Sequence, residues 1–380
     1  MRRTLTWSLF FCLGPLSTAH SEAPRCGPKE QFSWSALETS GQGPSWRSSP
    51  AVVALDDALW VFGGVYDDFR NAHNEFYDDL YRLDLVSGRW LSLNTSQAPA
   101  ARAFAAAAAE PEQGNMLLFG GSQYEADFSV IRMFGDVWSF DPYTEAWSEL
   151  QPRNAGPSPR ASAAVWVHEG QLYVFGGIEE SFALRNDLWA LDLRTLAWRE
   201  VIADGQDGSP APRRLAQVSA LRRRHRITLY GGEGLSEQSG DFETLNDSWE
   251  LDLDAASWTE ITPAQGHNLT PARNDGAATS CGRYLYLVGG DMPFGQAGCG
   301  SPFAQQVTNE IWRFDPLRRS FRLLEPTTPP LPALKRTGYA TWNGRLYLVS
   351  GWGFRCEEAG DPGQIWNSEV IAVDIDCDTP

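Results

Sequence analysis

The stretch Leu-Tyr-Val-Phe-Gly-Gly, from Leu172 to Gly177, carries the pattern that decides the fold. It is a short apolar run of aliphatic and aromatic residues that ends in two glycines. Such a run predicts a buried strand, because it is too short for a helix. The glycines let the backbone turn sharply and let a neighbouring segment approach closely. We therefore expect a buried strand followed at once by a change of direction.

This block recurs along the whole chain at a spacing of roughly 55 to 60 residues, which is in the range of propeller arrays. The copies are Trp60–Gly64, Leu117–Gly121, Tyr173–Gly177, Thr228–Gly232, Tyr286–Gly290 and Tyr347–Gly351. One unit of this size cannot bury both faces of a small sheet, so the units must stack against each other. The repeat predicts six stacked units.

Three further strands are expected in each unit. A strand that alternates apolar and polar residues follows each glycine block, and it carries an aromatic residue at one position in five copies: Tyr81, Trp138, Trp189, Trp249 and Trp312, with Ile371 in the sixth. An outer strand led by an aromatic residue comes next, at Trp90, Trp147, Trp198, Trp258 and Phe321. A strand of small residues, such as Ala161–Val167, precedes each block and suits a crowded central axis.

The sixth outer strand is missing at the C-terminus, and Trp34 supplies its aromatic residue near the N-terminus. We therefore expect Phe32 to Leu37 to complete the last sheet, which would close the ring and remove a free edge. The predicted fold is an all-β, six-bladed propeller with four antiparallel strands in each blade. The expected blades are about 47–93, 102–150, 160–201, 213–261, 273–324, and 336–374 together with 32–37.

The glycine pairs, the aromatic residue of the following strand and the tryptophan of the outer strand resemble the kelch-repeat family, within the galactose oxidase/kelch-like superfamily. The resemblance covers essentially the whole chain after its first residues. It implies a kelch propeller, a fold that serves binding modules, scaffolds and a few enzymes. The function must therefore be argued from sites.

The first 19 residues read as a secretory signal peptide, followed by an N-terminal segment at 20–31. Arg2 and Arg3 precede an apolar run, and Ser17 to Ala19 form a small-residue cleavage site. A membrane anchor is the alternative, but the run is short of the ~20 residues that a spanning helix needs. We expect a secreted or periplasmic monomer without membrane insertion. A formal net charge of −17 argues against nucleic acid as a partner.

Secretion favours disulfide bonds. We pair Cys26 with Cys377, because the closure places their neighbouring strands side by side, and Cys299 with Cys356, which lie in loops of adjacent blades. Cys281 is left as a free thiol or an intermolecular link, and a fully reduced chain is the alternative.

Three Asn-x-Ser/Thr sequons occur in the chain. Asn94 and Asn268 fall at strand ends or in loops and are the expected glycan sites in a eukaryotic secretory pathway. Asn246 occupies a position of the repeat itself and is expected to cap a turn.

An arginine precedes the expected inner strand of each blade: Arg47, Arg102, Arg160, Arg213, Arg273 and Arg336. Sixfold repetition would place these guanidinium groups around one mouth of the channel, where they could bind carboxylates. In kelch proteins that this chain resembles, arginines at the channel mouth often grip acidic peptides. The alternative is that each arginine pairs with an acidic loop residue and only braces neighbouring blades.

The loops after the glycine blocks are long and unlike each other, which is where recognition is usually built. Trp46, Tyr66, Trp352 and Trp366 are the aromatic residues expected to offer a stacking surface to a sugar or a peptide. The alternative is that the rings pack these loops onto each other.

We expect no metal and no cofactor. His168 and His225 fall in turns on the far face, and no pair of histidines has the sequence spacing of metal ligands. No catalytic motif is present either.

The sequence thus predicts a secreted kelch module that binds a protein, an acidic peptide or a glycan on its loop face. The alternative is an enzyme. A periplasmic sialic-acid mutarotase is similar in fold, length and export signal, and it would need a Glu or His beside an arginine in a deep pocket.

Overall fold

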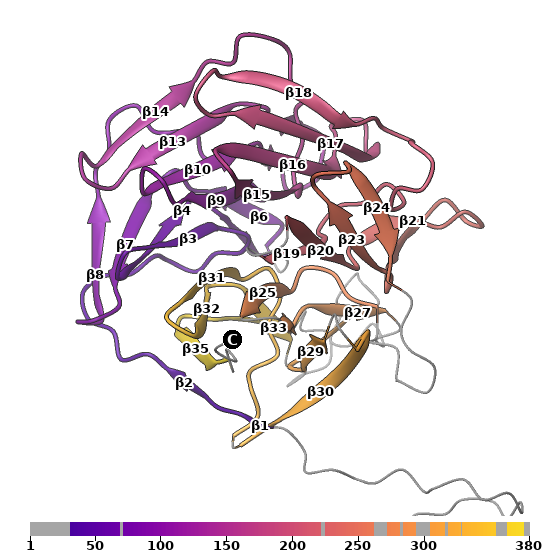
Figure 1. Cartoon of the computed structure of the whole chain (residues 1–380). Coiled ribbons are helices and arrows are strands. Elements are labelled where there is room, and N and C mark those ends of the chain that lie inside the picture. The colour runs from indigo at the N-terminus through magenta and orange to yellow at the C-terminus, as the bar shows by residue number, and fades with distance from the viewer. Residues whose placement is uncertain are drawn as a thin grey trace, which may run out of the picture. The chain divides into compact units, whose positions relative to one another are not determined.

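The computed structural model describes residues 31–68, 71–221, 225–261, 272–281, 284–293, 305–315, 318–327, 329–354 and 363–375. The chain divides into two units, Met1–Glu30 and Gln31–Pro380, and only the second contains described residues. Its strands form six small antiparallel sheets around a ring, so the six-bladed propeller expected from the sequence is confirmed (Figure 1). None of the described residues forms a helix that could span a membrane.

Blades one to three each contain four strands from one continuous stretch of the chain. Blade one has β3 (Ala51–Leu55), β4 (Ala58–Phe62), β7 (Leu80–Asp84) and β8 (Arg89–Leu93). Blade two has β9 (Ala106–Glu110), β10 (Asn115–Phe119), β13 (Val137–Asp141) and β14 (Ala146–Leu150). Blade three has β15 (Ala164–His168), β16 (Gln171–Ile178), β17 (Leu184–Asp192) and β18 (Ala197–Ile202). Figure 1 shows blade three running outward from β15 to β18 at the rim.

Blades four to six complete the ring. Blade four has β19 (Gln217–Leu221), β20 (Arg226–Tyr230), β23 (Ser248–Asp252) and β24 (Ser257–Glu260). Blade five has β25 (Ala277–Cys281), β26 (Tyr284–Val288), β29 (Ile311–Asp315) and β30 (Ser320–Pro326), with β1 (Gln31–Phe32) added at its edge. Blade six has β31 (Gly338–Trp342), β32 (Arg345–Val349), β35 (Val370–Asp374) and β2 (Trp34–Ala36).

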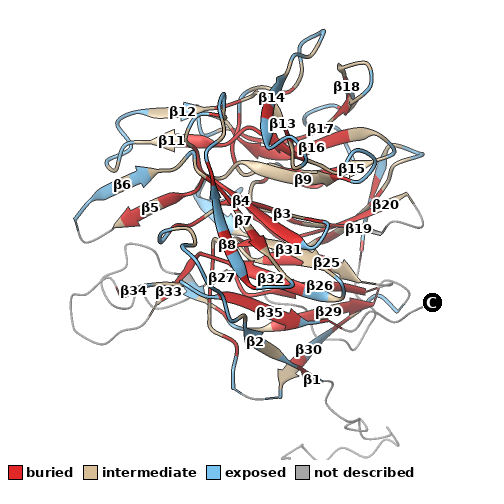
Figure 2. Cartoon of the chain, turned by 90° about the vertical axis from the view of Figure 1, so that its left-hand side faces the viewer, coloured by how far each residue is buried: buried red, intermediate tan, exposed pale blue. Residues whose placement is uncertain are grey.

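Two-stranded hairpins begin after the glycine pairs, or after Ser350–Gly351 in blade six, between the second and third strands of the blades. They are β5 (Val65–Asp68) with β6 (His73–Phe76), β11 (Ser122–Tyr124) with β12 (Ile131–Met133), β21 (Glu233–Leu235) with β22 (Phe242–Thr244), β27 (Asp291–Pro293) with β28 (Gln305–Val307), and β33 (Trp352–Phe354) with β34 (Gln364–Trp366). In blade three, β16 and β17 themselves continue into the hairpin through a register shift. Because these hairpins leave the same end of the strands, they share one face, which we call the hairpin face (Figure 2).

The glycine pairs let one blade contact the next. Gly176 has a φ of +62°, and a Cβ there would lie 2.7 Å from the carbonyl oxygen of Arg213 in the following blade. The Gly177 N–H donates a hydrogen bond to that same carbonyl at 2.8 Å. A side chain at Gly176 would therefore clash with backbone and push the two blades apart.

Aromatic contacts also join successive blades. The residue before the first glycine of one blade meets the outer-strand aromatic residue of the next: Phe62 with Trp147, Phe119 with Trp198, Phe175 with Trp258, and Tyr230 with Phe321. Burial of rings of this size dominates the energetics of a core. The recurrence of these residues in the sequence thus reflects packing between blades.

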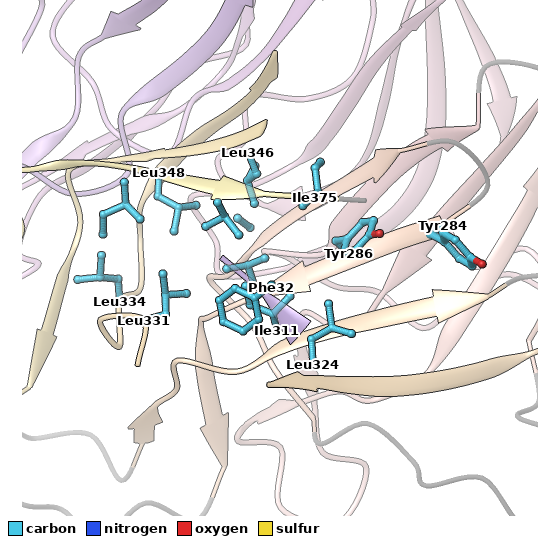
Figure 3. Close-up of a cluster of buried hydrophobic side chains, with 14 residues drawn as sticks. Phe32, Tyr284, Tyr286, Ile311, Leu324, Leu331, Leu334, Leu346, Leu348 and Ile375 are labelled. Atoms are coloured by element: carbon cyan, nitrogen blue, oxygen red, sulfur yellow. The ribbon is translucent and has the colours of Figure 1, made fainter. Parts of the chain in front are cut away.

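The N-terminal segment closes the ring, but it serves two blades. Strand β2 pairs antiparallel with β35, as expected, with Trp34 opposite Val373. Strand β1 instead pairs in parallel with β30 of blade five, so Phe32 does not belong to the last sheet. Phe32 is buried in a cluster with residues of both blades, among them Leu324 and Leu334 (Figure 3). The segment therefore joins blades five and six.

One cysteine prediction is wrong. Cys281, at the end of β25, is disulfide-bonded and not a free thiol. Its partner lies outside the described residues, as do Cys26, Cys299, Cys356 and Cys377. Of the two expected glycan sites, Asn94 is exposed directly after β8, and Asn268 lies outside the described residues.

Candidate functional site: the channel mouth and the hairpin face

Five of the six predicted arginines are buried inside their blades and form ion pairs there. Arg160 shows the arrangement: its Nη1 and Nη2 donate to the two carboxylate oxygens of Asp187 at 2.6 and 3.0 Å. Its Nη1 also donates to the carbonyl oxygen of Gly176 at 3.0 Å. The Trp189 indole donates to the same carboxylate at 2.9 Å. One arginine thereby joins the segment before the inner strand, the glycine turn and the third strand of a blade.

The same brace recurs in the other four blades of this set. The pairs are Arg47 with Asp79, Arg102 with Asp136, Arg213 with Asp247, and Arg273 with Glu310. The sequence left open whether these arginines bind a ligand or brace the fold, and the contacts of these five are those of a brace. The arginine side chains make these contacts within one blade. Their backbone carbonyls accept a hydrogen bond from the preceding blade, and the Gly64 N–H donates to the carbonyl oxygen of Arg102 at 2.8 Å in this way.

Two of the braces favour the ionised form of their carboxylate. Burial opposes ionisation of Asp136 most strongly, but the hydrogen bonds and the charge of Arg102 outweigh it and lower the pKa of Asp136. The pKa of Asp247 is lowered in the same way, against burial, by Arg213. The carboxylates of Asp136 and Asp247 are therefore ionised at neutral pH.

Arg336 is not the sixth member of this set, which corrects the predicted register by two residues. The position equivalent to Arg273 is Leu334, since the Gly290 N–H donates to the Leu334 carbonyl at 3.0 Å just as Gly232 donates to Arg273. Leu334 is buried in an apolar cluster, and Glu369, which precedes the third strand, is exposed. Aligning the repeats by their arginines misplaced Arg336, because backbone geometry and not side-chain identity defines the position.

Arg336 instead belongs to a ring of residues around the central channel. One residue from each blade has a positive φ between 51° and 57°: Ser49, Phe104, Ser162, Leu215, Asp275 and Arg336. Backbone hydrogen bonds run from blade to blade around this ring, for example from Phe104 N–H to the Ser49 carbonyl at 3.2 Å and from Ser49 N–H to the Arg336 carbonyl at 2.7 Å. The ring encloses a cavity of about 270 Å³, lined mainly by small residues of the inner strands.

The charged groups at this mouth neutralise each other. Arg336 donates from Nε to Asp275 at 3.3 Å, and its Nη1 lies 3.7 Å from Asp67. The Tyr124 hydroxyl donates to the same Asp67 oxygen at 2.9 Å. Burial raises the pKa values of both Asp67 and Tyr124. The mouth thus offers a compact, internally paired cluster and not a row of free guanidinium groups.

A second buried pair lies beside it, between Lys335 and Asp291. Burial raises the pKa of Asp291 to about 6 and lowers that of Lys335. The described lining of the cavity contains Arg336 and Asp275 but neither glutamate nor histidine.

The predicted loop aromatics do not form one surface. Trp352 is fully buried, with the Lys335 ammonium 4.5 Å from its ring centre. Tyr66 and Trp366 contact each other across the junction of blades one and six, with ring centres 5.0 Å apart. Trp46 is 53% exposed. Packing of loops onto each other, the alternative considered for these rings, accounts for Trp352 and for the Tyr66–Trp366 pair.

Sequence reasoning missed a matched pair of hairpin tips in blades two and three. In each, a phenylalanine N–H donates back to a glutamate carbonyl three residues earlier, from Phe128 to Glu125 at 2.8 Å and from Phe182 to Glu179 at 2.9 Å. Both phenylalanines have positive φ, 58° and 64°, and both are more than half exposed. A bulky residue is rarely held in this conformation, and such strain gathers at functional sites. The shared Glu-x-x-Phe was the available signal.

Other exposed apolar side chains lie on the same face. They are Val130, Leu235, Phe242 and Ile365. Exposed carboxylates surround them: Glu75, Glu125, Asp127, Glu180, Glu237, Asp241 and Glu243. Exposed cations are fewer on the described hairpins, and Arg132 is among them. The hairpin face is therefore apolar at its tips and acidic around them.

Comparison with known proteins places the chain in a family. The model of the KLHDC2/KLHL20/DRC7 Kelch-repeats domain matches residues 28–177, 70–290 and 163–351. The chain belongs to the kelch-repeat family. Similar proteins include acyl-CoA-binding domain-containing protein 4 of Arabidopsis thaliana, 30% identical over 68% of this chain and 36% of that protein. Human Kelch domain-containing protein 3 is 27% identical over 57% of this chain and 55% of that protein.

This chain therefore matches only about a third to about half the length of these kelch relatives. Among solved structures, the "Structure of YjhT" superposes with a TM-score of 0.61, covers 86% of this chain and 95% of that chain, and is 18% identical. At this identity the likeness concerns the fold alone.

Proposed function

We propose that this kelch propeller is a secreted protein-binding module that recognises its partner on the hairpin face. The observation that carries this proposal is the matched pair of strained, exposed phenylalanines, Phe128 and Phe182. Aromatic side chains are the commonest anchors of protein interfaces, and rigid turns that display them reduce the entropy lost on binding. Kelch propellers generally bind proteins, which agrees with this assignment.

The charge around the tips selects the kind of partner. The arginines expected to hold an acidic peptide are engaged inside the blades, and acidic side chains surround the apolar tips. Complementary charge speeds encounter and suppresses wrong partners. The partner surface that fits is therefore apolar and basic. Binding of acidic peptides or glycans is the competing result that the test below can detect.

The test is binding of the protein to an array of basic–apolar peptides, acidic–apolar peptides and glycans. Phe128→Asn and Phe182→Asn remove the aromatic rings, and asparagine tolerates positive φ, so the fold is retained. Tyr143→Asn is the matched control, because Tyr143 is 77% exposed in a turn at the opposite end of the strands.

We expect basic–apolar peptides to bind the wild type and the control, and to be lost with the double phenylalanine variant. Hits confined to acidic peptides or glycans, or hits that survive the loss of both rings, would overturn the proposal.

A further inference from the structure

Two turns at the end of the propeller opposite the hairpin face bring metal-ligand side chains together. His168 ends β15 and Glu169 follows it in blade three, whereas His225 precedes β20 in blade four. One ligand atom from each of these three residues lies within 4.8 Å of the others. Sequence spacing could not reveal this group, because the two histidines are brought together by the stacking of neighbouring blades.

One of the distances between ligand atoms matches that expected for direct coordination. The Nε2 atom of His225 lies 3.3 Å from Oε1 of Glu169. In a tetrahedral site with bonds of about 2.0–2.1 Å to nitrogen and oxygen, two ligand atoms are about 3.3–3.4 Å apart. The imidazole rings of His168 and His225 have centres 4.7 Å apart and meet edge-on at 71°.

A carboxylate contacts the second ring nitrogen of one of the histidines. Nδ1 of His225 lies 3.0 Å from Oδ1 of Asp254, in the turn between β23 and β24. When Nδ1 carries the proton and donates it to Asp254, the lone pair of Nε2 is free to bind a metal. Metal-bound histidines almost always have such an outer partner, which fixes the tautomer and the ring orientation.

His168 supplies an independent observation. Its Nε2 atom is buried and has no hydrogen-bond partner among the described residues. Buried polar atoms are nearly always satisfied, and an exception calls for an explanation such as a missing ion. Glu169 and His225 are by contrast 67% and 38% exposed, which gives an ion access from solvent.

We propose that His168, Glu169 and His225 bind one divalent transition-metal ion, with zinc the best match, and that the ion joins blade three to blade four. Two imidazole nitrogens and one carboxylate are ligands that zinc accepts, and a water would complete a tetrahedral shell. Asp254 acts as a positioning residue through His225. This site is separate from the hairpin face and does not depend on the proposed binding function.

The experiment uses tag-free protein treated with EDTA, dialysed and titrated with zinc, and followed by calorimetry and by the melting temperature. We expect one zinc per chain and a melting temperature that rises with zinc concentration, since an ion that binds only the folded state stabilises it. Cobalt(II) in place of zinc should give the visible absorption of a tetrahedral ion.

Two variants test ligands, a third tests the positioning residue Asp254, and a fourth serves as control. His225→Ala should abolish both the calorimetric signal and the zinc-dependent rise in melting temperature, and Glu169→Gln should weaken binding. Asp254→Asn should weaken affinity about 10–100-fold. His73→Ala, at an exposed histidine on the hairpin face, should change nothing. No zinc binding by the wild type, or equal binding by His225→Ala and the wild type, would overturn the proposal.

Discussion

In blades one to five a buried arginine joins the segment before the inner strand to the third strand, whereas in blade six Leu334 occupies the same place. The other residues of the brace also differ in blade six. Glu369, at the position of the acidic partner, is exposed. Ile371 occupies the position at which four other blades have a tryptophan whose indole donates a hydrogen bond to the acidic partner. Blade six replaces ionic bracing with apolar packing.

The N-terminal segment accounts for this exception. Leu334 packs in the cluster that contains Phe32, and β1 and β2 attach to blades five and six. The blade that is assembled from both ends of the chain is thus held by apolar contacts and by strand pairing. The most regular feature of the sequence, its repeated arginine, therefore makes ion pairs inside five blades.

The largest effect is expected from removing residues 31–37. This deletion takes away β1 and β2, and the loss of Phe32 alone should cost about 3–5 kcal/mol, as for other buried phenylalanines. Denaturant unfolding should show a fall in the free energy of unfolding larger than that for any single substitution. An unchanged midpoint would mean that blade six does not depend on the N-terminal segment.

Breaking a brace should come next. Arg160→Met leaves Asp187 buried without its partner, which typically costs about 3–5 kcal/mol. The matched change in blade six, Leu334→Met, preserves volume and should cost less than about 1.5 kcal/mol. Equal losses at the two positions in denaturant unfolding would remove the distinction between the blades.

Replacing both residues of a brace by apolar residues should recover much of the stability lost when the arginine alone is replaced. Arg213→Leu leaves the carboxylate of Asp247 without its arginine partner, and adding Asp247→Leu removes that charge. Replacement of a buried ion pair by apolar residues is often neutral or stabilising. We expect the double variant to unfold at higher denaturant concentration than Arg213→Leu alone. A double variant less stable than the single one would show that apolar packing cannot replace the ion pair in blade four.

A smaller effect should appear in the pH dependence of stability. Because the pKa of Asp247 is lowered in the folded state, its ionisation stabilises the fold above the unfolded carboxyl pKa of about 3.9. The difference in unfolding free energy between the wild type and Asp247→Asn should therefore be constant near neutral pH and shrink as the pH falls below about 4. A difference that grows on acidification would contradict the lowered pKa.

The sequence was sufficient for the fold because packing between blades uses residues that recur, such as Phe175 and Trp258. The sequence was insufficient to predict the channel mouth. There the backbone hydrogen bonds show that Leu334, and not Arg336 two residues later, is equivalent to the arginines of the other blades. The sequence also could not place His168 beside His225, because that contact depends on how neighbouring blades stack. The strained tips at Phe128 and Phe182 needed φ angles to be recognised.

The most direct test of the account measures peptide binding and unfolding side by side for two variants, Arg213→Leu/Asp247→Leu and Phe128→Asn/Phe182→Asn. If the arginines stabilise the blades and the hairpin tips bind the partner, the first variant remains folded and still binds basic–apolar peptides. The second variant keeps its stability but does not bind. Loss of binding in the first variant while it remains folded, with binding retained in the second, would contradict the account.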